Sequence, residues 1–161
     1  MPAFWGILAG VFAGDWAVKR WADAALKGRA GWVVIPRVLE LRYSRNRGMA
    51  LGILSENAWA ALTLPVIAVA VWLLVFRKYR ITSFTSCASA LLLGGFAGNF
   101  ANRLLLGYVV DMIYFPFLPW FICNPADIAI CAGALMLGAS LLLRPQDWRE
   151  KHAKDDGPGA P

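Results

Sequence analysis

Two aspartates at the edges of apolar segments, Asp111 and Asp127, have the type and spacing best suited to catalysis. Asp111 follows the apolar run Tyr108–Val110, and Asp127 opens the last long apolar stretch after Asn124-Pro125-Ala126. The connection between them is short, so we expect both carboxyls at the same end of the two apolar segments that it joins. Neighbouring carboxyls share one proton, which lets one activate water while the other donates a proton. Two other interpretations remain open: a helix N-terminal acid for Asp127, and a solvated loop residue for Asp111.

Two further polar pairs lie within apolar segments at helical spacing. Asp15 precedes Lys19 by four residues, and Asn99 precedes Arg103 by four. Residues four apart share one face of a helix, and acid before base is the favourable order. Charged groups inside membrane spans are costly and usually have a partner or a purpose. Each pair is therefore either a structural contact near a helix end or a support for another site.

The remaining reactive side chains do not form a site. The cysteines are Cys87, Cys123 and Cys131, and the single histidine, His152, lies in a polar tail. No pair among them has the spacing of metal ligands, and three cysteines do not make a disulfide framework. No nucleophile has a paired base, so water activated by two aspartates is the mechanism that remains. We expect no metal and no cofactor.

The composition indicates an integral membrane protein. Of 161 residues, 59% are hydrophobic and 16% charged, and the mean hydropathy is +0.54. Soluble domains are about one-quarter charged, and disordered chains need far fewer apolar residues. The net charge is +6, and the charged residues lie between long apolar stretches. We therefore expect membrane lipids with anionic headgroups as partners, and no nucleic acid.

Four stretches are predicted to cross the membrane as helices, so the expected fold is an all-α membrane protein. They span about 3–22, 58–76, 81–101 and 125–143, close to the 20 apolar residues that a span needs. Gly94 and Gly98 in the third have a spacing that lets helices approach closely. We place residues 1–143 in one membrane-embedded domain and interpret 144–161 as a disordered cytoplasmic tail.

The connections after the first and the third predicted span lie on the side of the membrane opposite the termini. Their sequence patterns differ. Alternation of apolar and polar residues at 39–44 indicates a half-buried strand, so we predict a small β-element on the membrane surface at about 31–46. The aromatic loop from Tyr114 to Phe121 is expected to lie along the bilayer surface. Four spans place both termini on one side. The seven basic residues from Arg20 to Arg47 make the charge count a near tie, so charge bias does not fix the orientation.

Two non-catalytic interpretations compete with a catalytic site. Acids within a membrane also mark proton or ion pathways, which would suit a small transporter or channel subunit. The polar groups gather toward one face, however, whereas a conduction path needs them through the full depth. A membrane assembly factor without chemistry would leave the clustered aspartates and asparagines unexplained.

Four segments, in order, resemble motifs of the lipoprotein signal peptidases (signal peptidase II), which are bacterial membrane aspartyl proteases. The segments are Asp15-Trp16-Ala17-Val18-Lys19, Asn46-Arg47-Gly48-Met49-Ala50-Leu51, the run from Gly94 to Asn99 with Arg103 and Gly107–Asp111, and Asn124-Pro125-Ala126-Asp127. The resemblance covers roughly residues 5–143. Each motif is weak by itself, but all four in the same order are specific.

The resemblance implies roles for these residues. Asp111 and Asp127 match the catalytic dyad, and the active-site support comprises Asn46, Gly48, Asn99, Arg103, Asn124, Asp15 and Lys19. The implied substrates are prolipoproteins with a diacylglyceryl group on the lipobox cysteine, cut just before that cysteine. The implied location is the bacterial inner membrane, with cytoplasmic termini, several spans and an active site near the outer face. We expect a monomer.

The chain departs from the family pattern at one important position. Asn102 precedes Arg103 where the family usually has aspartate. The asparagine keeps hydrogen-bonding capacity but loses a negative charge, so we do not count it as catalytic. Trp16 and Leu51 are milder departures.

Overall fold

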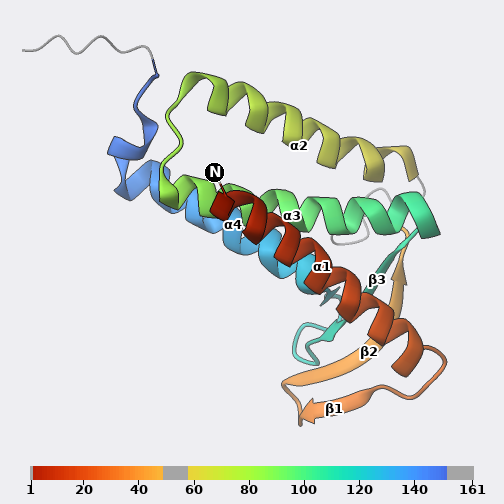
Figure 1. The fold of residues 1–161 in the computed structure, drawn as a ribbon. Helices are drawn as coiled ribbons and strands as arrows, with labels where there is room; N and C mark the ends of the chain where they lie inside the picture. Colours follow the sequence, from red (N-terminus) through yellow and green to blue (C-terminus); the bar gives the residue numbers. More distant parts are fainter. Residues whose placement is uncertain (1, 49–57, 152–161) are drawn as a thin grey trace, which may run out of the picture.

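The computed structural model describes residues 2–48 and 58–151 (Figure 1). It has four long helices and a four-stranded antiparallel sheet at one end of them. The elements, in chain order, are α1 (Pro2–Ala25), β1 (Trp32–Ile35), β2 (Leu39–Asn46), α2 (Ala58–Lys78), α3 (Ser83–Leu106), β3 (Val109–Tyr114), β4 (Ile122–Cys123), α4 (Pro125–Leu143) and the 3₁₀ helix η2 (Pro145–Trp148).

Helix α3 is the centre of the bundle, packed between α1 and α4, while α2 lies farther out (Figure 1). Small residues allow the close approach. Gly98 and Gly94 face α1, where an added Cβ on Gly94 would lie 2.9 Å from the Cβ of Val11. Gly133 of α4 lies against the α3 backbone, and a Cβ added to it would lie only 2.6 Å from the carbonyl oxygen of Ala88. The glycine spacing in the third predicted span therefore reflects helix packing.

Local signals set the ends of α3. Thr82 is its N-cap and forms a reciprocal capping box with Thr85, which satisfies backbone N–H groups at the helix start. At the other end Gly107 has a φ of 77°, and its N–H donates to the Arg103 carbonyl. A residue with a Cβ rarely adopts this left-handed conformation. The chain thus turns sharply out of α3 and directly into β3.

The sheet is larger than the predicted β-element because the 107–124 connection contributes two strands. The strand order is β1-β2-β3-β4, so β2 pairs with β3 across some 65 residues of sequence. Residues 109–112 of β3 are all buried, on both faces of the strand. A strand covered on both faces has no apolar–polar alternation. Apolar–polar alternation in the sequence therefore does not predict β3.

The C-terminal turns of α1 cover one side of the sheet. Ala22 and Leu26 form a buried apolar cluster with Val110 and Met112 of β3. All four are at most 2% exposed. The cluster attaches the sheet to the helices at the strand that carries Asp111.

The described residues contain two helices that are long and apolar enough to cross a membrane, Ser83–Leu106 and Pro125–Leu143. The prediction of four crossings is therefore supported in part. Helices α1 and α2 occupy the positions predicted for the other two spans. In α1 the charges from Asp15 onward lower the apolar character of its second half.

The start of the predicted disordered tail is ordered instead. Residues 145–148 form η2, and buried Asp147 accepts hydrogen bonds from Arg144 Nε (2.7 Å) and Ser140 Oγ (3.2 Å). The Trp148 ring packs against Phe76, with ring centroids 5.9 Å apart. These contacts hold the segment against the ends of α2 and α4, which composition alone did not indicate. Residues 152–161 of the predicted tail lie outside the described residues.

The close approach of α4 to α3 predicts different effects for two alanine substitutions in α4. Gly133→Ala places a Cβ against backbone atoms that cannot move aside, and overpacking of this kind costs about 1–3 kcal/mol. Gly138→Ala meets no atom within 4 Å and is the matched control. It should be neutral or slightly stabilising, since alanine favours helix. Thermal unfolding in detergent measures both, and equal melting temperatures would contradict the packing.

Candidate active site

The start of α4 is a capping box that also presents a carboxylate. Asn124 is the N-cap, its Oδ1 accepting the Asp127 N–H at 3.1 Å, while Asp127 Oδ2 accepts the Asn124 N–H at 3.1 Å. Pro125 follows at the first helical position, where its missing N–H is not needed. Asp127 is thus an acid at a helix N-terminus, as one of the two interpretations of this residue predicts. The cap leaves the Asn124 side-chain nitrogen free to turn toward a second residue.

That second residue is Asp111, which lies fully buried in β3. The Asn124 Nδ2 donates to Asp111 Oδ1 at 2.6 Å, and the Asn46 Nδ2 donates to Asp111 Oδ2 at 3.0 Å. Asn46 ends β2, the strand paired with β3. Asp111 is therefore a buried carboxyl held by two amides and not a solvated loop residue.

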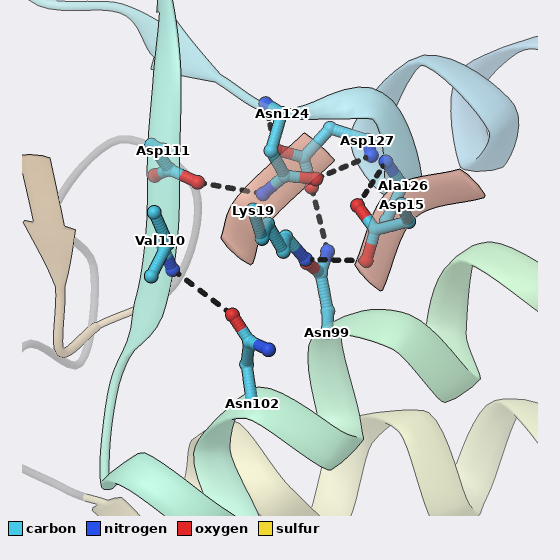
Figure 2. A network of polar contacts seen from close by, with 9 residues as sticks. All are labelled: Asp15, Lys19, Asn99, Asn102, Val110, Asp111, Asn124, Ala126 and Asp127. Atoms are coloured by element: carbon cyan, nitrogen blue, oxygen red, sulfur yellow. Dashed lines mark hydrogen bonds and ion pairs between the residues drawn. The ribbon is translucent and has the colours of Figure 1, made fainter. Parts of the chain in front are cut away.

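Asp127 is reached from α3 and α1 as well as from its own helix. Asn99 Nδ2 donates to Asp127 Oδ1 at 2.7 Å, and Asn99 Oδ1 accepts from Lys19 Nζ at 2.8 Å (Figure 2). An ammonium group has only donors, so the Asn99 oxygen must face Lys19 and its nitrogen must face Asp127. Lys19 thereby fixes the orientation of the amide that holds a carboxylate.

Asp15 connects α1 to the start of α4. Its Oδ1 accepts the backbone N–H of Ala126 at 2.9 Å, and its Oδ2 pairs with Lys19 Nζ at 2.8 Å. Both side chains are at most 2% exposed. Gly98 lies directly against the Asp15 carboxylate, where a Cβ would have no room. Asp15 thus supplies an additional cap for α4 from another helix.

Arg103 and Gly48 complete the group of predicted site residues. The Arg103 Nη2 donates to the Gly48 carbonyl oxygen at 2.9 Å, and the Gly48 N–H donates to Asn46 Oδ1 at 3.0 Å. The second contact orients the Asn46 amide so that its nitrogen faces Asp111. Residues 49–51, the end of the same motif, lie outside the described residues.

All nine predicted site residues therefore belong to one continuous set of polar contacts. It runs from Arg103 through Gly48 and Asn46 to Asp111, then through Asn124 to Asp127 and on to Asn99, Lys19 and Asp15. The prediction missed one member of the neighbourhood. Asn102, 2% exposed, accepts the Val110 N–H at 3.2 Å (Figure 2). Its only sequence signal is its position next to Arg103.

Burial determines the electrostatics of Asp111. Desolvation raises the pKa of Asp111 to about 6, and the nearby Asp127 charge acts in the same direction. The amide donors of Asn124 and Asn46 and the charge of Lys19 oppose this rise without cancelling it. Burial likewise raises the pKa of the Cys123 thiol to about 12, which keeps it protonated at neutral pH. Cys123 thus behaves as a packing residue.

Apolar helices therefore carry at one end a buried carboxyl, Asp111, and a half-buried one, Asp127, joined through Asn124. The family model for signal peptidase (SPase) II matches residues 7–143. The chain belongs to the signal peptidase II family, and the resemblance seen in the four motifs is confirmed.

Relatives and solved structures agree with this membership. The lipoprotein signal peptidase of Streptococcus thermophilus (strain CNRZ 1066) is 36% identical over 148 residues, covering 91% of this chain and 92% of that protein. That of Latilactobacillus sakei subsp. sakei (strain 23K) is 34% identical over 135 residues, covering 83% and 89%. A solved bacterial membrane enzyme has a TM-score of 0.82 at 29% identity, covering 96% of both chains.

The buried pair Asp15–Lys19 predicts a large effect for Lys19→Met. Removing one partner leaves an uncompensated buried charge, which costs about 3–5 kcal/mol. Lys27→Met is the matched control, because Lys27, in the turn after α1, pairs with Asp23 of α1 at the same i,i+4 spacing, at 3.1 Å but with side chains 43% and 31% exposed. That pair contributes at most about 1 kcal/mol. Unfolding in detergent compares the two variants, and similar losses would contradict the assignment.

Proposed function

We propose that this protein removes the signal peptide from prolipoproteins, with Asp111 and Asp127 as its catalytic residues. The observation that carries the proposal is Asn124, which donates its side-chain nitrogen to the Asp111 carboxyl and its backbone N–H to the Asp127 carboxyl. One residue thus holds both carboxyls in one place. The named relatives are lipoprotein signal peptidases, which supports the substrate class.

The two aspartates have different surroundings and therefore different roles in this proposal. Asp111 is fully buried, and its raised pKa favours the protonated form. Asp127 is half-buried and lies in the first turn of α4, where the helix dipole favours a negative charge. We assign the shared proton to Asp111 and the ionised carboxylate to Asp127. A pair of carboxyls with diverging environments is the usual basis for separate acid and base roles.

The reaction then needs only water and these two groups. Asp127 accepts a proton from water while the water oxygen attacks the scissile carbonyl carbon. Asp111 donates its proton to the carbonyl oxygen, which gives a tetrahedral intermediate with two hydroxyl groups. When the tetrahedral intermediate collapses, the C–N bond breaks and the proton on Asp127 passes to the leaving nitrogen of the lipidated cysteine. In the same collapse one hydroxyl of the intermediate returns its proton to Asp111, which leaves the signal peptide as a carboxylic acid and restores the dyad.

The membrane helices offer an apolar site suited to the lipid on such a substrate. A cavity of about 280 Å³ lies between α2 and α3. Its lining is apolar and consists of Pro65, Val66, Val69, Leu93, Phe96, Ala97 and Phe100. Phe100 directly follows Asn99 in α3, so the cavity approaches the polar site along one helix. We propose that an acyl chain of the substrate's diacylglyceryl group occupies this cavity.

The remaining expectations follow the family. We propose four membrane crossings, cytoplasmic termini and an active site near the outer face of the bacterial inner membrane. The sheet and the Tyr114–Phe121 segment would then lie at the outer surface, where exposed Trp120 and Phe117 suit the headgroup region. We expect the enzyme to act as a monomer in contact with membrane lipids.

Replacing either carboxyl with its amide tests the dyad directly. Asp111→Asn and Asp127→Asn each remove a proton-transfer group while keeping the size of the side chain. We expect each to lower the rate of cleavage by at least about 100-fold. The measurement is cleavage of a diacylglyceryl-modified prolipoprotein by purified protein in lipid, with the cut site read by mass spectrometry.

Asp147→Asn is the control, because Asp147 is also buried but lies in η2, after the C-terminal end of α4, whereas Asp127 lies in the first turn of α4. It should cleave at the rate of the unaltered protein wherever it remains folded. Full activity in either dyad variant would refute the aspartyl mechanism.

The pKa of about 6 at Asp111 predicts the pH dependence of cleavage. A site that needs its proton on Asp111 loses activity as pH rises through that pKa. For kcat/KM, which reports the free enzyme, we expect this alkaline limb near pH 6. Bound substrate excludes water and raises the pKa further, so the limb of kcat should lie at higher pH. A kcat/KM that rises steadily from pH 6 to 9 would contradict the assignment of the proton.

A further inference from the structure

Asn102 is a buried polar residue that the proposed reaction does not use. It lies on α3 with 2% of its surface exposed, one residue before Arg103. Its Oδ1 accepts the backbone N–H of Val110 at 3.2 Å, and Val110 immediately precedes Asp111. The contact therefore joins the central helix to the strand at the residue next to a catalytic carboxyl.

The contact has a fixed direction. The backbone N–H of Val110 is only a donor, so the amide oxygen of Asn102 must face it. On the other side of β3, Val110 is paired with Arg45 of β2. Since Val110 is 2% exposed, loss of the Asn102 oxygen would leave a buried N–H without its acceptor. The strand would then have to shift or open at this point.

The neutral charge of Asn102 is the second observation. The charged groups that act on Asp111 come from three elements: Asp127 of α4, Lys19 of α1 and Arg103 of α3. The neighbours from β2 and from the cap of α4, Asn46 and Asn124, are neutral. A carboxylate at position 102 would accept the same N–H and also add a further negative charge beside Asp111 and Asp127. Asparagine supplies the acceptor without that charge.

We propose that Asn102 is a positioning residue for Asp111: its side-chain oxygen fixes the backbone of β3 at Val110, and its neutrality adds no further negative charge beside Asp111 and Asp127. The inference rests on the proposed function for its kinetic consequences. The positional part stands on the hydrogen bond alone.

Two substitutions separate the two parts. Asn102→Leu keeps a similar volume but removes the acceptor, whereas Asn102→Asp keeps the acceptor and adds the charge. Ser89→Ala is the control, because Ser89 is another fully buried polar residue of α3, remote in sequence from the site. The readouts are amide exchange at Val110, kcat and KM, and the pH profile of kcat/KM, each for protein in lipid.

For Asn102→Leu we expect faster exchange at Val110 and a kcat lowered by about 10- to 100-fold with little change in KM, since small displacements of catalytic groups have effects of this size. For Asn102→Asp we expect exchange as in the unaltered protein and an alkaline limb moved upward by about one pH unit. Ser89→Ala should change neither.

Each part has its own contradictory result. Unchanged exchange at Val110 in Asn102→Leu would overturn the positional part, whether or not the protein cleaves prolipoproteins. An unshifted pH profile in active Asn102→Asp would overturn the charge part. If the unaltered protein failed to cleave, the proposed function would fall, and the exchange measurement would still decide the position of β3.

Discussion

The buried ion pair between Asp15 and Lys19 is the interaction on which the rest of the site depends. Each partner makes one further contact: Asp15 caps the start of α4, and Lys19 orients the Asn99 amide toward Asp127. Buried pairs seldom add net stability over apolar residues of the same size. Here the pair fixes where a helix begins and which way an amide points, and both determine the position of Asp127.

Asparagine is the common element of the site because its two ends have opposite hydrogen-bonding character. Asn46, Asn99 and Asn124 each accept from a group that can only donate, and each turns its nitrogen to a carboxylate. Neutral amides thus hold two carboxyls without neutralising them. An arginine or lysine in direct contact would favour the ionised form, whereas the proposed mechanism needs a proton on one of the two carboxyls.

Much of the site could be predicted from the sequence because its residues lie at helix ends and at helical spacing. The i,i+4 relation of Asp15 to Lys19 indicated a pair, and the Asn124–Asp127 segment indicated a helix start. The strand carrying Asp111 was not predicted, since burial on both faces removes the alternating pattern. Asn102 is not counted as catalytic in the sequence analysis because it lacks the negative charge of the family's usual aspartate. Its contact with a backbone N–H is one that no side-chain pattern can indicate.

The pairing of β2 with β3 also sets the order in which this protein can be assembled. Asn46 is synthesised long before Val109, its partner across the sheet, and helices α2 and α3 come between them. The first hairpin can therefore complete its sheet only after α2 and α3 have been synthesised. Asp127 comes later still, at the start of the last long helix. A nascent chain must therefore reach this helix before it contains both carboxyls, so the candidate site is one of the last parts of the fold to be completed.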